Sequence, residues 1–133
     1  MNILKGEIES VSVKNSLSLV KIRSSNIPLS VIVIDTPESA PYLKAGNMVK
    51  VIFKETEVII GKNTSHEISL QNKLTGKITS IDSGELLSKL NINTNAGKVI
   101  SVITSNAVKQ LELEVGSMVT AMIKTNEMML SYD

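Results

Sequence analysis

The chain has 133 residues, of which 42% are hydrophobic and 20% are charged, and its formal net charge at pH 7 is +1. This composition is typical of a globular protein and excludes a disordered chain. Because the charge is close to zero, the sequence lacks the generally basic character of proteins that bind nucleic acids or other polyanions.

Cysteine is absent, and His66 is the single histidine. The lack of cysteine excludes disulfides, thiolate metal sites and cysteine nucleophiles. With so few groups for general-base or transition-metal chemistry, we expect a protein that is not an enzyme. One Phe, two Tyr and no Trp leave the core to Val, Ile, Leu and Met, a choice that favours strands.

The first residues carry charges at Lys5, Glu7 and Glu9 and contain no apolar run of signal-peptide length. No later stretch approaches the roughly 20 apolar residues of a membrane span. We therefore expect a soluble cytoplasmic protein with no membrane partner.

An internal repeat organises the chain. Residues 1–63 align with residues 71–133 without a gap, so that adding 70 to a residue number gives its equivalent. The unmatched pairs are mostly apolar with apolar, and identical pairs run through both halves. They include Asn2 with Asn72, Gly6 with Gly76, Gly46 with Gly116, Lys54 with Lys124 and Glu57 with Glu127. We interpret the chain as a duplicated module.

In chain order, the first copy covers residues 1–63 and the second copy covers residues 68–133. Between them, GKNTSHEIS (residues 61–69) has the Gly, Asn, Thr and Ser content of a connection. We expect the first copy to repeat the elements of the second, with PESAPYLKAG (residues 37–46) as its short helical segment.

In the second copy, apolar alternation predicts three strands, and a short helical segment follows them. The strands are GKITSI (residues 76–81), LSKLNINT (residues 87–94) and KVISVIT (residues 98–104). The helical segment is SNAVKQLEL (residues 105–113), for which Ser105 or Asn106 is the expected N-cap.

Two final strands, VTAMIK (residues 119–124) and EMMLSY (residues 127–132), are expected to pair as a hairpin around Thr125 and Asn126. Five short strands and one helical turn in about 65 residues match a small closed barrel of the OB type. We therefore predict an all-β fold of two tandem OB-like five-stranded β-barrels, each with a short helical turn. Because each barrel is small, we expect the two to pack on each other or on other subunits.

The second copy resembles the Mop family. SLQNKLTG (residues 69–76) is similar to the S-A-R-N-Q-L-x-G opening of Mop domains. Three later segments are similar to the family's A-x-I-T, L-x-x-G and I-K-A-x-x-V-x-L motifs. They are VIT (residues 102–104), LEVG (residues 113–116) and the segment from MIKT to ML (residues 122–130). The likeness covers the whole second copy and, more faintly, the first, and the duplication resembles the two-Mop molbindins.

This resemblance implies a di-Mop protein that binds molybdate or tungstate as an oxyanion, with no organic cofactor, for storage, homeostasis or sensing. It also implies binding sites at the subunit interfaces of a homo-oligomer. Similarity to the two-Mop proteins favours a trimer. Similarity to the C-terminal half of the molybdate-responsive regulator, which is dimeric, makes a dimer the alternative.

The resemblance makes eight residues candidate ligands of the oxyanion. Hydroxyl, amide, backbone and ammonium donors can together hold a tetrahedral dianion without a strongly basic surface. The candidates are Ser69, Leu70, Gln71, Asn72, Thr104, Ser105, Lys124 and, in the first copy, Lys54.

The chain also departs from the family pattern. Gln71 stands where the family has Arg, which loses a charge and a bidentate donor, and Ala107 stands where the family has Ser. In the first copy the opening is reduced to MNIL (residues 1–4) and Ile34 replaces the threonine, although Lys54 remains. These changes predict weaker affinity, fewer sites, or one purely structural copy.

Other interpretations stay open. Lys54 and Lys124 can guard strand edges, Ser69 can satisfy a turn, and His66 suits an exposed loop. The alternative function is an OB-like module that binds a protein or single-stranded nucleic acid, although few aromatic residues disfavour nucleic acid. A third is a ligand-sensing subunit that has lost or never had a DNA-binding half. No helix-turn-helix pattern occurs, so we do not expect direct operator binding.

Overall fold

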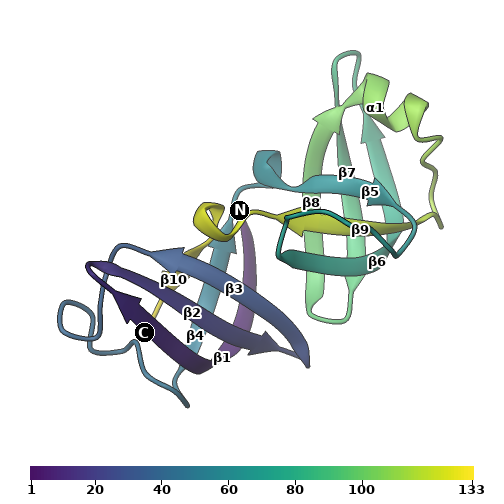
Figure 1. The fold of residues 1–133 in the computed structure, drawn as a ribbon. Coiled ribbons are helices and arrows are strands. Elements are labelled where there is room, and N and C mark those ends of the chain that lie inside the picture. The colour runs from purple at the N-terminus through teal and green to yellow at the C-terminus, as the bar shows by residue number, and fades with distance from the viewer.

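The structure, a computed structural model, describes residues 1–133 and consists of two five-stranded sheets that meet at a central junction (Figure 1). The first half contains β1 (Asn2–Lys14), β2 (Leu17–Ser24), β3 (Ile27–Val33), β4 (Met48–Phe53), the 3₁₀ turn η1 (Glu55–Glu57) and β5 (Ile59–Lys62). The second half contains β6 (Asn72–Ser83), β7 (Leu87–Thr94), β8 (Gly97–Thr104), α1 (Ser105–Gln110), β9 (Met118–Ile123), the 3₁₀ turn η2 (Thr125–Glu127) and β10 (Met129–Ser131). The predicted all-β fold of two tandem barrels is confirmed. No helix in the structure has the length and apolar character needed to cross a bilayer.

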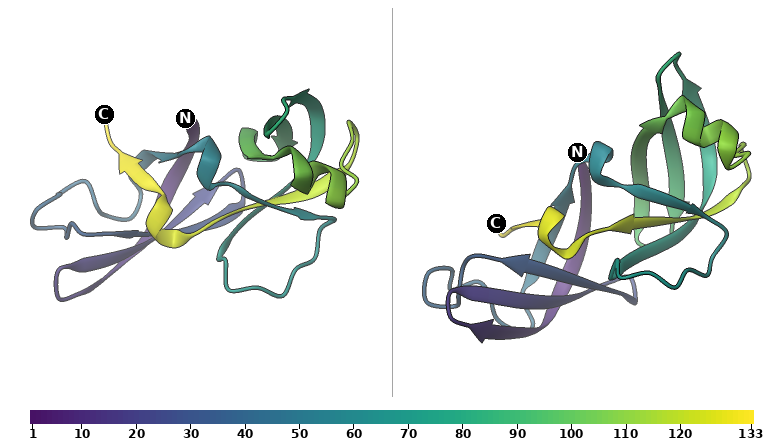
Figure 2. Two further views of the ribbon diagram at one scale, coloured as in Figure 1. Left: turned by 90° about the horizontal axis from the view of Figure 1, so that it is seen from above. Right: turned by 45° about the horizontal axis from the view of Figure 1, so that its top comes forward.

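The two halves exchange their last strands. One sheet has the order β10-β4-β1-β2-β3 and the other has the order β5-β9-β6-β7-β8. Leu130 of β10 pairs with Val51 of β4, and Ile60 of β5 pairs with Ala121 of β9. In Figure 2 the last residues of the chain run out of the second barrel and into the first. Each half therefore receives its fifth strand from the other.

The predicted hairpin around Thr125 and Asn126 is therefore wrong. A two-residue hairpin turn of the usual type needs positive φ at both central residues, and neither Thr125 nor Asn126 has it. These residues instead form η2, which is flanked by extended backbone at Lys124 and Met128. The chain thus makes one short turn and continues forward into the other sheet.

The predicted helical segment over residues 37–46 is also wrong, because this segment forms only turns. In the second half, the Leu111 amide donates to the Ala107 carbonyl at 3.0 Å and closes the end of α1. The equivalent residues in the first half are Pro37 and Pro41, and Pro41 has no amide hydrogen for this bond. The N-cap of α1 is Thr104, so neither predicted N-cap, Ser105 or Asn106, is correct.

Alternation along the strands builds one continuous core. Side chains of β1 alternate between buried and exposed positions from Asn2 to Ile8, and those of β6 do so from Asn72 to Ile78, except that Lys73 is half-buried. The buried apolar side chains of both barrels form a single cluster of 22 residues, in which Phe53 is the only aromatic one. The division into copies at residues 1–63 and 68–133 stays a prediction about the repeat, since neither sheet is built from one copy alone.

Two asparagines hold the halves together. The side-chain amide of Asn2 donates to the Ile100 carbonyl at 2.8 Å and accepts from the Ile100 amide at 2.7 Å. Asn72 makes the equivalent pair with the Ser30 backbone at 2.9 and 2.7 Å. Both asparagine side chains are buried. Because Ile100 and Ser30 are themselves equivalent in the repeat, the junction has an approximate two-fold symmetry.

A glycine allows the first two strands of each barrel to cross closely. A Cβ atom on Gly6 would lie 2.4 Å from the Ile22 Cγ2 atom, and one on Gly76 would lie 2.5 Å from the Asn93 carbonyl oxygen. Either contact is too short for a side chain of any size. Gly76, the last residue of the Mop-like opening motif, is therefore required for the close packing of these strands.

Candidate functional site

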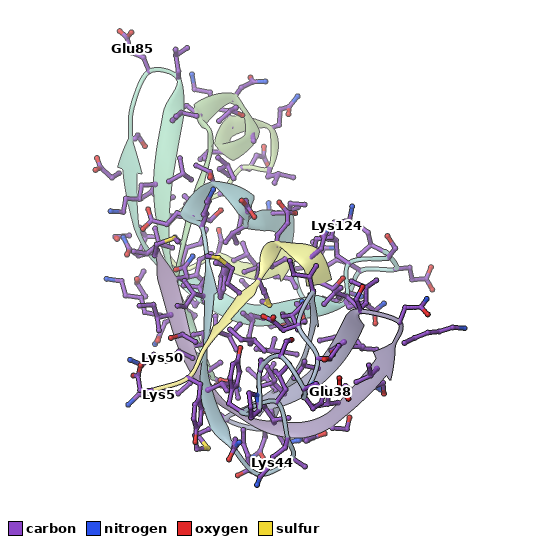
Figure 3. All side chains as sticks on the ribbon, turned by 90° about the vertical axis from the view of Figure 1, so that its left-hand side faces the viewer. Lys5, Glu38, Lys44, Lys50, Glu85 and Lys124 are labelled. Atoms are coloured by element: carbon purple, nitrogen blue, oxygen red, sulfur yellow. The ribbon has the colours of Figure 1, made fainter.

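Lys54 and Lys124 occupy equivalent places in the two halves. Each follows a central strand, β4 or β9, and each is the extended residue that precedes a 3₁₀ turn. Both side chains are exposed, and Figure 3 shows Lys124 at η2, near the junction of the halves. Lys54 Nζ lies 3.9 Å from Glu57 Oε1, whereas Lys124 forms no ion pair. Lys124 is thus the free ammonium of the two.

Two carboxyls meet at the same junction. Glu57 of η1 is close enough to Glu127 of η2 to be the main influence on the pKa of the Glu127 carboxyl. The hydrogen bond with Glu57, burial and the Glu57 charge raise the pKa of the Glu127 carboxyl, and the Lys124 charge partly opposes them. The repeat showed that these glutamates are equivalent, but only the exchange of strands brings them face to face.

The opening of the second copy lies beside Lys124. Asn72, the first residue of β6, pairs with Ile123, the last residue of β9. Gln71 and Lys124 are the next residues outward on these two strands, so they flank the same end of the sheet. Ser69 and Gln71 are exposed and Leu70 is half-buried. The buried Asn72 side chain is committed to the Ser30 backbone.

Several donors at this end of the sheet are unused. The backbone amides of Leu70 and Gln71 donate to no group within the chain. The same holds for the Ser69 hydroxyl, the Gln71 side-chain amide and the Lys124 ammonium. Donors without internal partners are what a site for an anion requires.

Thr104 and Ser105 lie elsewhere. Thr104 pairs with Leu87 at the end of the sheet where β6 finishes, whereas Asn72 marks the end where β6 begins. The Thr104 hydroxyl caps α1 by accepting from the Ala107 amide at 3.1 Å. The Ser105 hydroxyl donates to the Gly84 carbonyl at 2.7 Å and lies 2.8 Å from the Ser88 hydroxyl. Figure 1 likewise shows α1 far from the junction.

The register therefore places Gln71, which directly follows Ser69 and Leu70 in the chain, and Lys124 at one end of the sheet, and it places Thr104 and Ser105 at the other end. The binding roles of all eight candidates stay predictions. His66, expected as an exposed loop residue, is half-buried, and its ring lies against Gly61. No group of three or more His, Cys, Asp or Glu side chains is placed to hold a metal ion.

Known proteins show similarity to both the sequence and the fold. Residues 68–130 match the TOBE domain family. A probable molybdenum-pterin-binding protein of Haemophilus influenzae is 37% identical over 68 residues, which are 50% of this chain and 99% of that protein. The chain belongs to the molybdenum-pterin-binding, or Mop, family.

Two further relatives resemble this Mop protein over its whole length. The molybdenum import ATP-binding protein ModC of Rhizobium etli is 28% identical over 124 residues, which are 92% of the chain but 32% of ModC. The cytoplasmic molybdate-binding protein ModG, in a crystal form with molybdate bound, superposes with a TM-score of 0.92 at 24% identity. The superposition covers 99% of the chain and 96% of ModG. It shows that the tandem Mop fold extends through both halves.

Proposed function

We propose that this Mop protein binds molybdate as an intact oxyanion in the cytoplasm and catalyses no reaction. The observation that carries the proposal is the cluster of unused donors at the start of β6, formed by Ser69, Leu70, Gln71 and Lys124. The names of the Haemophilus relative and of ModG connect the family and the fold with molybdenum and molybdate.

The chemistry of the cluster suits a tetrahedral dianion. Two successive backbone amides, one hydroxyl and one side-chain amide supply directional donors, and Lys124 supplies charge. Because Lys124 is its only charged donor, the cluster does not attract polyanions in general. Because tungstate has the same charge and shape, it would occupy the same donors, and the protein would serve storage, homeostasis or sensing of either oxyanion.

The position of Thr104 supports a site shared between subunits. Its hydroxyl accepts one hydrogen bond from the Ala107 amide and keeps its own hydrogen free to donate. Because Thr104 lies at the opposite end of the sheet from Gln71, it reaches an anion there only from another chain. We therefore propose a homo-oligomer, a trimer in preference to a dimer, with oxyanions at its interfaces.

The second copy is the better equipped of the two. The first copy has Lys54, but this lysine faces Glu57, and Ile34 stands where the second copy has Thr104. Lys54 would therefore have at most a supporting role in oxyanion binding at the junction. We expect fewer oxyanions per chain than two equal copies would hold.

Isothermal titration of the purified protein with molybdate, tungstate and sulfate tests this proposal. Lys124→Ala removes a charged donor and is expected to weaken molybdate binding about 10- to 100-fold, or about 1.5–3 kcal/mol. Ser69→Ala is expected to weaken it less. Lys44→Ala, which changes an exposed lysine in the 34–47 loop, is the matched control and should leave the affinity unchanged.

Light scattering on the same samples gives the number of subunits. If none of the three oxyanions produces heat with the wild-type protein, the oxyanion proposal fails. The alternative would then be an OB-like module that binds a protein or a single-stranded nucleic acid. The stacking of Tyr42 on Tyr132 weighs against a nucleic acid, since these rings are not free to stack on bases.

A further inference from the structure

A cleft of about 380 Å³ lies on the outer face of the first sheet, away from the cluster just described. Strands β1, β4 and β10 form it, and its lining residues are Lys5, Met48, Val49, Lys50, Ser131 and Asp133. Figure 3 shows Lys5 and Lys50 close together beside the last strand. None of the lining residues belongs to the eight oxyanion candidates.

The register of the sheet gives this cleft a row of donors. Lys5 of β1 pairs with Lys50 of β4, and Lys50 pairs with Ser131 of β10. Directly opposed residues of an antiparallel sheet share a face, so the two lysines and the serine are neighbours on one face of the sheet. Two like charges in this arrangement repel each other, and an anion between them removes the repulsion.

A carboxylate of the chain already approaches this row. Asp133 Oδ2 lies 2.8 Å from Lys50 Nζ, and this hydrogen bond and the lysine charge lower the pKa of Asp133. The neighbouring Tyr132 ring stacks on Tyr42, with 5.2 Å between the ring centroids and 4° between the ring planes. The stacked tyrosines hold the tail over the first barrel, so that Asp133 is kept beside Lys50.

The fold itself does not require these charges. The equivalents of Lys5, Lys50 and Ser131 in the second barrel are Thr75, Thr120 and Gly61. These residues form the same row of three adjacent strands without a single charged group. The cationic row is therefore a feature of the first barrel alone, added to a scaffold that forms without it.

We propose that this cleft is a second anion site, for a tetrahedral dianion such as phosphate or the phosphate group of a monoester, and that Asp133 is its internal competitor. The ammoniums of Lys5 and Lys50 would hold two of the oxygens and the Ser131 hydroxyl a third. Met48, whose side chain is exposed, offers an apolar wall for the organic part of an ester. In the adjoining cleft Arg23 is paired with Glu9, so it does not compete for the anion. This inference does not rest on the proposed molybdate site.

Titration calorimetry with inorganic phosphate and with glycerol phosphate tests the proposal. Asp133→Asn removes the competing charge, and we expect at least threefold tighter binding of both probes. Tyr132→Ala releases the tail and is expected to act in the same direction. Lys5→Thr and Lys50→Thr should each weaken binding about tenfold or more. Since both introduce the residue of the equivalent position in the second barrel, the fold should persist, and circular dichroism checks this.

Lys44→Thr is the matched control, because it removes one positive charge from a loop outside the row. Unchanged binding in this variant supports a specific site, whereas a loss equal to that of Lys50→Thr means attraction by net charge and overturns the proposal. Asp133→Asn that binds no tighter than wild type, or Lys50→Thr that binds equally well, also overturns it. Tighter binding of glycerol phosphate than of inorganic phosphate would identify a monoester as the ligand.

Discussion

At the scale of single residues, Asn72 has a structural role, joining the two halves, that the sequence motif does not reveal. Its side chain is fully buried and makes two hydrogen bonds with the Ser30 backbone across the junction. Asn72→Ala would leave a buried amide and a buried carbonyl without partners, and we expect a loss of about 2–4 kcal/mol in the free energy of unfolding. Urea denaturation measures this loss.

The neighbouring residue provides the control for this prediction. Gln71 is exposed and has no internal hydrogen bond, so Gln71→Ala should change the free energy of unfolding by less than about 0.5 kcal/mol. Equal effects of the two substitutions would show that Asn72 does not join the halves.

Glu127 predicts a pH dependence of stability. Its pKa is raised above the ordinary value of 4.5, chiefly by the hydrogen bond with Glu57. The folded state therefore holds the proton more tightly than the unfolded state, and stability falls as the pH rises from that value through the folded pKa. Glu127→Gln should remove this fall and stabilise the protein at pH 7 by about 0.5 kcal/mol, the usual size for exposed charges.

Thermal unfolding of wild type and variant between pH 4 and pH 8 checks this expectation. Glu85→Gln is a suitable control because Glu85 is an exposed carboxyl at a turn far from the junction (Figure 3). A wild-type protein whose stability rises across this range relative to Glu127→Gln would contradict the account.

At the scale of elements, the strand exchange predicts how the halves behave when separated. A chain of residues 1–63 lacks β10 and a chain of residues 68–133 lacks β5, so each leaves a central strand unpaired on one side. We expect neither fragment to be a stable folded monomer, and we expect an equimolar mixture to form a folded 1:1 complex. Light scattering and circular dichroism measure both properties, and a stable monomeric fragment would contradict the exchange.

Most strands were predictable because the alternation of apolar and polar residues within a strand indicates which of its faces is buried. The interval predicted for β7 is the observed one, and those for β6 and β8 lie within the observed strands. The pairing of β10 was not predictable in this way. Because the copies are alike, Leu130 finds an apolar partner in either sheet, Val51 in one or Ala121 in the other. The choice depends on the geometry of η2 and on contacts between the halves.

The candidate site was predictable only in part. The Mop-like motif pointed to Ser69, Gln71 and Lys124, and the register of β6 with β9 places the last two at one end of the sheet. The separation of Thr104 from them depends on the length and direction of β6 and β8, which a motif does not contain. The row of Lys5 and Lys50 was missed because it appears only once the strand register is known. Its one signal in the sequence is that the equivalent positions, Thr75 and Thr120, are uncharged.

At the scale of the whole molecule, the two barrels are expected to unfold as one cooperative unit. They share a single apolar cluster, exchange strands and are joined by the Asn2 and Asn72 hydrogen bonds. We expect one unfolding transition, with amide protection of Val20 in the first barrel and Leu90 in the second lost at the same denaturant concentration. Two separate transitions would show that the barrels are independent.

We propose that the unused donors at the start of β6 hold an oxyanion. A crystal structure of the protein grown with molybdate, with anomalous scattering recorded at the molybdenum edge, tests it most directly. We expect an anomalous peak within hydrogen-bonding distance of Ser69, Leu70, Gln71 and Lys124, with Thr104 of another subunit close by. Molybdenum peaks only at other places, or none at saturating molybdate, would contradict it.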